Sequence, residues 1–344
     1  MTSILTWIAA IILLGIVILV HELGHFWSAR SVGIKVLSFG IGFGPKLFTW
    51  TGKDGVKYVI RLLPLGGYNR YFGEDSNEGD HKDAFHNQPV GKRAFSTFAG
   101  PFMNFVTAVV AFFLLFCAFG VPYSVPEIGS MTAGYPAQEA GLLVGDKFVS
   151  VNGEEVRDVE HVSIAIRQSA DEPVELTIDR NGNLIDVVVV PRMDADLGYA
   201  RIWITYAQEA QRYGAWDSVK LAFQNTWLSI AGTFDFLRGL VTRGEGVNDV
   251  AGPIGTLQVV VNETQSGGLR SYIGLLAMIS ISLGFFNMLP IPGLDGSRLL
   301  FLLVEKIRGK RIDPNKEGMI HLIGIGLLLL LMLPIYIRDI VRLF

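Results

Sequence analysis

The sequence predicts a polytopic α-helical membrane protein. We expect four transmembrane helices, a membrane-associated β-hairpin or sheet on the cytoplasmic side, and an inserted extracytoplasmic α+β domain. Half of the 344 residues are hydrophobic and only 18% are charged, against roughly 25% in soluble domains. Four apolar stretches reach the length of about 20 residues that a bilayer core requires. Residues 121–215, by contrast, hold 7 Lys+Arg and 15 Asp+Glu, a net charge of −8.

The four apolar stretches occupy residues 1–20, part of 94–126, 271–294 and 318–337. The first stretch lacks the basic start and the small-residue cleavage site of a signal peptide, so we expect a retained helix. Pro290 and Pro292 should break the third helix near its end, because proline cannot continue a helix.

Basic residues in short loops predict the orientation of these helices. Ten Lys and Arg residues lie in 30–93 and six in 298–316. Because loops rich in Lys and Arg stay cytoplasmic, we place both segments on that side, and the acidic segment and both termini outside. The net charge of the whole chain is −3, which gives no reason to expect nucleic-acid binding.

The acidic segment has the pattern of a small α+β domain. The expected elements are strands at 147–151, 174–179 and 184–190 and a short helix at 159–169. The sequence RNGN at 180–183 is a good hairpin turn between the last two strands. Farther on, residues 214–241 carry apolar side chains at helical spacing, which indicates either an interfacial helix or a fifth span.

Residues 34–68 also have strand character, with a turn at residues 53–55. Gly40, Gly42 and Gly44 lie in the first of these strands. They do not form a phosphate loop, because no Lys-Ser/Thr pair follows them and Pro45 blocks an immediate helix.

The motif HELGH, from His21 to His25, is the most specific feature of the chain. Residues four apart share one face of a helix, so both imidazoles can bind one zinc ion. Glu22 then lies beside the metal and can take a proton from its bound water. Two packed structural histidines are the alternative, but ionisable residues within a membrane span are costly and usually functional.

A catalytic zinc needs a third protein ligand, and Asp295 in the sequence NMLPIPGLDG is the candidate. An ordinary cap or turn at the membrane surface is the alternative for this carboxylate. Helices that enter near residues 4 and 271 reach His21 and Asp295 after similar climbs of about 25 Å. The two side chains meet only if 214–241 does not cross the membrane, which favours the interfacial helix.

Together these motifs resemble the site-2 protease family of intramembrane zinc metalloproteases, over nearly the whole chain. The sequence PAQEAGLLVGDKFVSVNG at 136–153 in addition resembles the conserved phrase of bacterial PDZ domains. The arrangement is similar to that of bacterial RseP-type proteases (regulator of sigma-E protease), in a form with a single PDZ domain.

The resemblance implies roles for individual residues. His21, His25 and Asp295 match the ligands of one Zn²⁺, Glu22 matches the catalytic glutamate, and Asn287 matches an asparagine that holds substrate.

Three further features are less specific. Family members place a sheet beside the active site, so the strand with Gly40, Gly42 and Gly44 could hold an unwound substrate; a plain amphiphilic hairpin is the alternative. Asn104 in the second span is a candidate for hydrogen bonding near the site, with simple packing equally open. His321 in the fourth span is expected to be a buried histidine rather than a ligand.

The function implied is zinc-dependent intramembrane endopeptidase activity on single-span membrane proteins, such as anti-sigma factors or remnant signal peptides. The expected partners are these transmembrane-helix substrates, a site-1 protease that makes a first extracytoplasmic cut, and the lipid bilayer of the bacterial cytoplasmic (inner) membrane. The active site should lie towards the cytoplasmic side. A non-catalytic PDZ membrane adaptor, another membrane zincin of protein quality control, and an ion transporter are the alternatives, although no internal repeats support the last.

The expected divisions of the chain are 1–30 (first helix with HELGH), 31–93 (cytoplasmic β region), 94–120 (second helix), 121–195 (PDZ domain), 196–269 (extracytoplasmic linker and interfacial helix), 270–303 (third span with the LDG motif), 304–316 (cytoplasmic loop) and 317–344 (fourth helix and tail).

Overall fold

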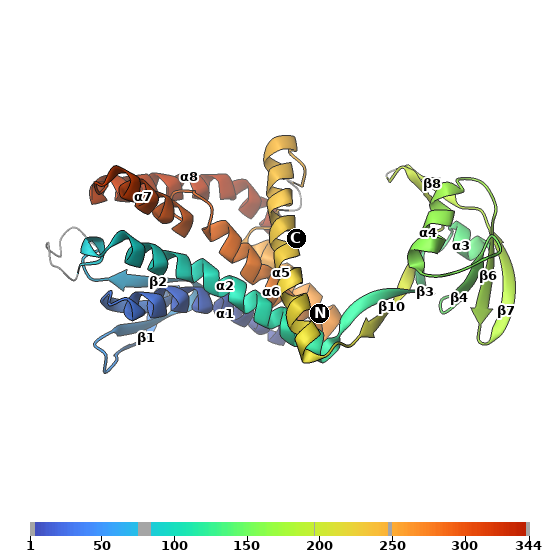
Figure 1. Cartoon of the computed structure of the whole chain (residues 1–344), viewed down its shortest axis with the longest axis horizontal. Coiled ribbons are helices and arrows are strands. Elements are labelled where there is room, and N and C mark those ends of the chain that lie inside the picture. Colours follow the sequence, from blue (N-terminus) through green and yellow to red (C-terminus); the bar gives the residue numbers. More distant parts are fainter. Residues whose placement is uncertain (1–3, 75–83, 196, 247–249, 342–344) are drawn as a thin grey trace. The chain divides into compact units, whose positions relative to one another are not determined.

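Figure 1 shows a computed structural model of the chain, which describes residues 4–74, 84–195, 197–246 and 250–341. The chain forms two compact units. The first, the membrane unit, comprises residues 1–118 and 214–344, and the second, the module, comprises residues 119–213.

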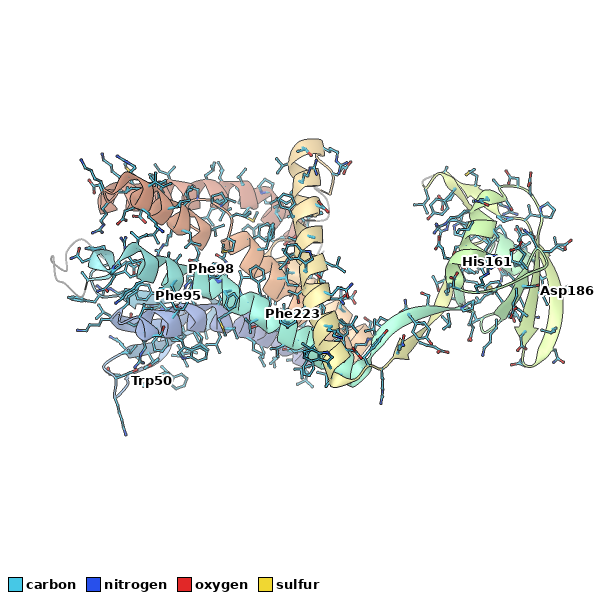
Figure 2. The ribbon with its side chains drawn as sticks, viewed as in Figure 1. Trp50, Phe95, Phe98, His161, Asp186 and Phe223 are labelled. Atoms are coloured by element: carbon cyan, nitrogen blue, oxygen red, sulfur yellow. The ribbon has the colours of Figure 1, made fainter. Side chains whose placement is uncertain are left out.

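Four helices among the described residues are long and apolar enough to cross a membrane: α1 (Ile4–Ser31), α2 (Val90–Phe119), α6 (Pro253–Asn287) and α8 (Pro314–Val341). They confirm the expected polytopic helical architecture. Their outward faces carry exposed apolar side chains, of which Phe95 and Phe98 on α2 are labelled in Figure 2. A bilayer suits such faces, because exposing the same apolar area to water is unfavourable.

Helix α6 differs from the third span expected at 271–294. It begins much earlier, and Gly268, with φ 60° and ψ −143°, interrupts its helical geometry. Glycine adopts this conformation without steric cost because it has no Cβ atom. The helix ends at Asn287 and not at 294, because Pro290 and Pro292 lie in the next turn and cannot continue it.

Strands β1 (Val36–Thr51) and β2 (Lys57–Tyr71) form the expected antiparallel hairpin. A hydrogen bond of 2.9 Å from the Gly52 amide to the Val56 carbonyl closes its turn. The end next to α1 is buried, whereas the far end is exposed and carries apolar side chains such as Trp50 (Figure 2).

Two further helices complete the membrane unit. Helix α5 (Ala215–Arg243) is the amphipathic helix expected at 214–241, and its exposed aromatic residues include Phe223 (Figure 2). Helix α7 (Asp295–Arg308) follows the turn after α6. A short 3₁₀ helix (Phe85–Asn87) precedes α2.

Helix α1 packs against a different neighbour at each end. Its first half packs on α6, where Leu13 and Val17 contact Val260 and Val261 in a buried cluster. Its second half packs on the β-hairpin, where the ring of Phe26 meets the ring of Phe39 at 5.2 Å. The HELGH motif lies on this second half, so the helix that carries it is held by both neighbours.

The module has a six-stranded sheet, in which five strands have the order β10-β3-β4-β6-β7 and β5 pairs with β4. These strands are β3 (Val121–Met131), β4 (Lys147–Val151), β5 (Glu154–Glu155), β6 (Val174–Arg180), β7 (Asn183–Val189) and β10 (Ile204–Gln211). The remaining elements are β8 (Arg192–Asp194), β9 (Tyr199–Arg201), α3 (Pro136–Glu139) and α4 (Val159–Gln168). The bounds of β4, β6, β7 and α4 lie within one residue of those expected.

The module extends beyond the expected limits of 121–195. Strand β10 pairs along β3 as far as Gln211 opposite Val121, so the sheet includes residues that the sequence suggested as a linker. Its core consists of apolar residues of the sheet and both helices, among them Ile128, Val162 and Ile178.

Candidate metal centre

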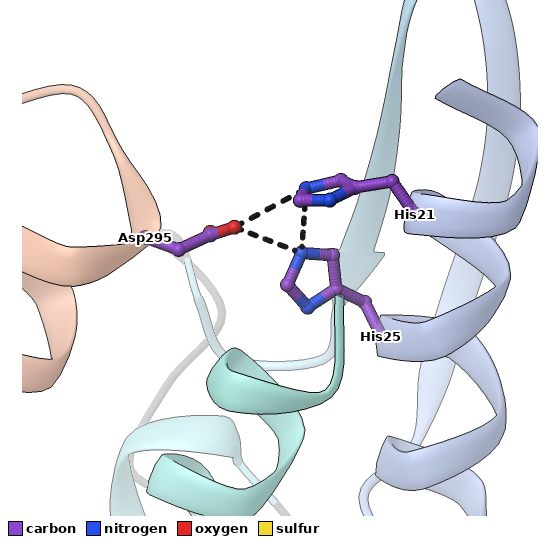
Figure 3. A group of neighbouring side chains, drawn as sticks. All are labelled: His21, His25 and Asp295. Atoms are coloured by element: carbon purple, nitrogen blue, oxygen red, sulfur yellow. Dashed lines mark hydrogen bonds and ion pairs between the residues drawn. The ribbon is translucent and has the colours of Figure 1, made fainter. Parts of the chain in front are cut away.

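His21, His25 and Asp295 converge in the membrane unit although 270 residues separate the last two. The histidines lie one turn apart on α1, with ring centroids 4.8 Å apart. Asp295 is the first residue of α7. Its Oδ2 lies 3.2 Å from the Nε2 atom of each histidine, and the two Nε2 atoms lie 3.2 Å from one another (Figure 3). The three atoms therefore form a nearly equilateral triangle.

This triangle fits a tetrahedral metal. Zinc binds nitrogen and oxygen at about 2.0–2.2 Å, so its ligand atoms lie roughly 3.3–3.5 Å from one another in a tetrahedron. Two imidazoles and one carboxylate are also a donor set that zinc accepts in catalytic sites, where it keeps its fourth position open. The three side chains are only 9%, 10% and 18% exposed. Their residues thus fit one buried zinc ion.

The outer nitrogens of both imidazoles have partners on α2. The Nδ1 atom of His25 lies 2.8 Å from the Ser96 carbonyl oxygen. A carbonyl only accepts, so Nδ1 carries the proton and Nε2 presents its lone pair to the metal position. The Nδ1 atom of His21 lies 3.2 Å from the fully buried amide of Asn104. Asn104 therefore lies within hydrogen-bonding distance of the outer nitrogen of His21.

Exchanging the nitrogen and oxygen of the Asn104 side-chain amide improves its hydrogen bonding. As drawn, Nδ2 faces His21 and the buried Oδ1 has no partner among the described residues. If His21 binds a metal through Nε2, its Nδ1 carries a hydrogen and must donate. Turning the amide gives that hydrogen an acceptor, Oδ1, at the same distance, and nitrogen and oxygen of an amide are exchanged by such a rotation.

Glycines allow the helices to approach closely around the histidines. A Cβ atom on Gly100 would overlap the ring of His25, and one on Gly24 would overlap the Ala99 carbonyl. Helices α1 and α2 therefore meet almost backbone to backbone at the centre, and a larger residue at either position would push the histidine-bearing face away.

The turn between α6 and α7 places Asp295. Gly293 adopts φ 100°, and its amide donates to Nδ1 of His321 on α8 at 2.9 Å. The backbone at Gly296 packs against the carbonyls of Met288 and Leu289, which leaves no room for a Cβ atom. His321 is not one of the side chains that converge with Asp295 among the described residues; it accepts a hydrogen bond from the turn, two residues before Asp295.

Two ion pairs connect α7 with other elements of the site. Arg93 on α2 binds both carboxylate oxygens of Glu305, at 3.0 and 2.5 Å. Arg298, one turn after Asp295, lies 3.1 Å from Glu74, which follows β2. Helix α7 is therefore tied to α2 and to the end of the hairpin.

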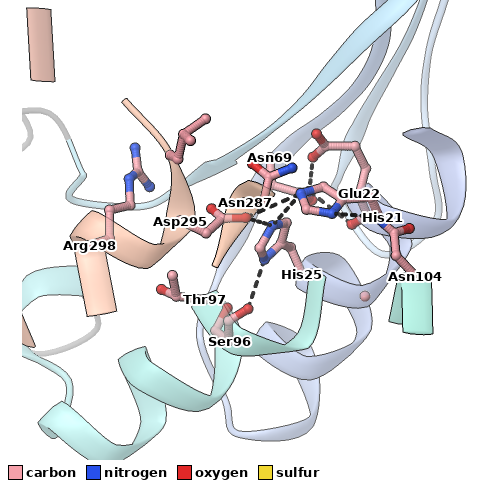
Figure 4. A network of polar contacts seen from close by, with 12 residues as sticks. His21, Glu22, His25, Asn69, Ser96, Thr97, Asn104, Asn287, Asp295 and Arg298 are labelled. Carbon is pink, nitrogen blue, oxygen red and sulfur yellow. Dashed lines mark hydrogen bonds and ion pairs between the residues drawn. The ribbon is translucent and has the colours of Figure 1, made fainter. Parts of the chain in front are cut away.

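Glu22 points to β2 (Figure 4). The Nδ2 atom of Asn69 donates to the Glu22 carbonyl at 3.0 Å and to its Oε2 at 2.8 Å. Asn69 was not among the residues predicted from the sequence. The strand period of two puts Gly67 and Asn69 on one face of β2, but it does not tell which element that face contacts.

The other predicted site residues lie at different distances from this centre. Asn287 lies at the end of α6 near Asp295 in Figure 4, and its Nδ2 donates to the Leu283 carbonyl at 2.9 Å. Gly40 pairs with Tyr68 in the hairpin, next to the strand segment that contacts Glu22. Gly42 and Gly44 lie farther along β1, with φ 90° and 85°.

Residues 9–331 match the model of peptidase family M50. The chain belongs to this family. A relative from Clostridium acetobutylicum, provisionally named a zinc metalloprotease, is 34% identical over 97% of each chain. The zinc metalloproteases RasP of Geobacillus kaustophilus and Oceanobacillus iheyensis are 30% and 29% identical; the matches cover 98% of this chain and 98–99% of theirs. The predicted membership of the site-2 protease family, and with it a metalloprotease, is confirmed.

The crystal structure of a PDZ domain, from an SdrC-like protein of Listeria monocytogenes, aligns with 25% of this chain and 92% of that domain. The identity is 18% and the TM-score 0.23. A TM-score this low does not establish a shared fold, so the PDZ assignment of the module stays a prediction.

Proposed function

We propose that this chain is a zinc-dependent endopeptidase that cuts membrane-spanning proteins within the bilayer. The observation that carries the proposal is the convergence of His21, His25 and Asp295 next to Glu22. Both histidines and Glu22 lie on α1, a helix apolar enough to cross a membrane, and Asp295 begins α7, which follows the turn after α6, another such helix. A buried cluster of ionisable groups in such a setting is costly unless it has a function. Membership of a peptidase family and relatives named zinc metalloproteases support the same reaction.

In the proposed mechanism, Nε2 of both histidines and Oδ2 of Asp295 hold the zinc ion. When bound, zinc polarises the scissile carbonyl and lowers the pKa of water to about 7. Glu22 accepts the proton of the attacking water and delivers it to the leaving amine. The Ser96 carbonyl and Asn104 keep both imidazoles in the tautomer that binds metal.

We propose that the substrate lies unwound beside the hairpin. A helix protects its own amide groups, so a transmembrane segment must become extended before its peptide bonds are accessible. Residues 38–41 of β1 are paired on both sides, so the edge for such a segment is the last part of β2, beside the strand that carries Gly40, Gly42 and Gly44. Asn287 lies near Asp295, where it could bind the same segment.

The topology follows from the basic loops. We propose that the segments around the hairpin and after Asp295 face the cytoplasm, and that the module and both termini face the outside of a bacterial inner membrane. The active site then lies towards the cytoplasmic side. The module, if a PDZ domain, would admit substrates that a site-1 protease has already trimmed; anti-sigma factors and remnant signal peptides are the candidate classes.

Glu22→Gln provides the test of this function. We expect the purified variant to bind one zinc ion per chain, because none of the three metal-binding atoms changes, and to lose cleavage of a model transmembrane peptide in proteoliposomes. Glu263→Gln, an exposed acid on α6, is the matched control and should cleave normally. Full cleavage by Glu22→Gln would refute the assigned role, and a parent protein without zinc would refute the metal centre.

A further inference from the structure

Asn69 contacts Glu22 at two atoms, the backbone carbonyl at 3.0 Å and Oε2 at 2.8 Å (Figure 4). We propose that Asn69 is a positioning residue, which fixes the carboxylate of Glu22 in the orientation needed for proton transfer. This inference rests on the proposed function, in which Glu22 carries the proton.

The orientation of the Asn69 amide is determined by its partners. One is a carbonyl and the other a carboxylate, and both accept hydrogen bonds. Rotating the amide would place Oδ1 against two oxygens. Unlike the amide of Asn104, that of Asn69 therefore has one acceptable orientation, with its NH₂ group towards Glu22.

The two bonds restrict Glu22 in a specific way. One nitrogen binds the main chain and the side chain of the same residue, so the carboxylate cannot rotate away without breaking a bond. Gly67, on the same face of β2, packs closely against the Glu22 side chain, because a Cβ atom there would lie 2.5 Å from Cγ and 3.1 Å from Oε1 of Glu22. Asn69 thereby holds Oε2, while Oε1 makes no hydrogen bond within the described part of the chain. Oε1 is thus the oxygen left for the proton.

The Asn69 amide lowers the stability of the fold, and this cost indicates a function. Its Oδ1 is buried and has no partner among the described residues. An unpaired buried acceptor destabilises a fold, whereas an apolar side chain in the same strand would not. Local rules of stability are broken mainly where function requires it, and here the break lies beside the catalytic carboxylate.

A purely structural role is the competing explanation, since the bond to the Glu22 carbonyl also ties β2 to α1. The two roles differ in what they change. Loss of a tie disturbs the metal ligands on α1 and substrate binding together, whereas loss of positioning lowers kcat and leaves KM and bound zinc unchanged.

The test compares Asn69→Leu, which removes the donor, with Asn69→Gln, which keeps an amide. Full-length protein in proteoliposomes is assayed for kcat and KM on a model transmembrane peptide and for zinc per chain. A shift of about 1 Å in a catalytic group can cost about 100-fold in rate. We expect kcat to fall about 10–100-fold in Asn69→Leu, with KM within twofold and one zinc per chain. Asn69→Gln should recover at least about fivefold of that loss.

Asn225→Leu is the matched control, because among the described residues this asparagine bonds only the Leu221 carbonyl on its own helix, at 2.9 Å. It should keep the kcat of the parent. The proposal is overturned if Asn69→Leu keeps kcat within twofold, if it loses zinc in proportion to activity, or if Asn69→Gln is as slow as Asn69→Leu. Activity that survives in Glu22→Gln would instead refute the proposed function itself, so the two failures are distinguishable.

Discussion

Two carboxylates, one in each unit of the chain, have opposite surroundings: Asp146 is buried in the module, and Asp295 in the membrane unit has a side chain that is 18% exposed. Arg180 binds both oxygens of Asp146 at 2.7 Å, and the Leu143 amide donates a further bond at 2.7 Å. Asp295 meets only the two imidazole nitrogens of His21 and His25 within the described residues.

The difference shows how to tell a structural acid from a functional one. The charge of Asp146 is neutralised by a fixed cation and its lone pairs are bonded, so it stabilises one conformation. The Asp295 carboxylate and the two imidazoles point their lone pairs at one common position. A cation bound at that position would accept all three lone pairs. No protein group occupies the position among the described residues.

The largest effect is expected from Asp295→Asn. Without the carboxylate the site loses one of three ligands, so activity should fall by more than the about 10–100-fold typical of changes around a metal site. Bound zinc, measured by elemental analysis of the purified chain, should fall with it. Asp235→Asn, at an exposed position on α5, is the control. Retention of one zinc per chain by Asp295→Asn would exclude Asp295 as a ligand.

A tenfold effect is expected at His321, which acts on the turn before Asp295. His321→Leu removes the acceptor for the Gly293 amide and should lower kcat about tenfold. His321→Asn can place an amide oxygen where Nδ1 lies, so it should stay near the parent. Steady-state kinetics of the pair decides this, and equal activity of the two variants would show that the bond to Gly293 has no role in placing Asp295.

Asp146→Asn should have the opposite signature, lost stability with intact chemistry. The variant leaves a guanidinium that is 27% exposed without its counter-ion, so the module should unfold at a lower temperature than in the parent. Cleavage of a short transmembrane peptide should not change. Asp186→Asn is the matched control, because this exposed carboxylate accepts a hydrogen bond from the half-buried Thr177 hydroxyl and from no other described residue; it should shift stability by less than about 0.5 kcal/mol. The unfolding temperature of the module in each variant is measured by limited proteolysis during heating.

The smallest effect concerns pH. Burial alone would raise the pKa of Asp146, but the bonds from Arg180 and the Leu143 amide lower it below the usual 3.8. A depressed pKa means that the ionised form stabilises the fold at neutral pH, and that this stability is lost as pH falls through the folded pKa. The stability gap between the parent and Asp146→Asn should therefore be constant at neutral pH and narrow below about pH 4. A gap that widens on acidification would contradict the assignment.

The three side chains that converge at the candidate metal centre could be predicted from the sequence, but the residues around Glu22 could not. HELGH is recognisable because metal binding needs rare residue types at fixed spacing. LDG is recognisable because a carboxylate within an apolar run is costly unless it has a function. Asn69 reaches Glu22 only through the register of the hairpin, in which irregular pairing places it opposite Phe39. Register depends on contacts distant in sequence, so no local pattern reveals it.

The same limit applies to two elements of the fold. Strand β10 pairs with β3 from more than 70 residues away and lacks a clear alternation of its own, so the sequence suggested a linker. Gly268 interrupts α6 in the middle of a helical pattern, and an isolated glycine there does not by itself indicate a kink. The strands β4, β6 and β7, whose turns and alternation are local, were predicted within one residue.

The pairing of Gln211 with Val121 brings the first and last strands of the module side by side, so the module can be exchanged as one segment. The chain enters and leaves it on adjacent antiparallel strands, whose Cα atoms lie about 4.5–5.5 Å apart. Cutting there leaves two ends that a turn of a few residues can rejoin, so a different module can be grafted without respacing the helices on either side. Tension applied across the two strands would open them one hydrogen bond at a time from that end, so the two strands would separate while helices α1 and α7 stay intact.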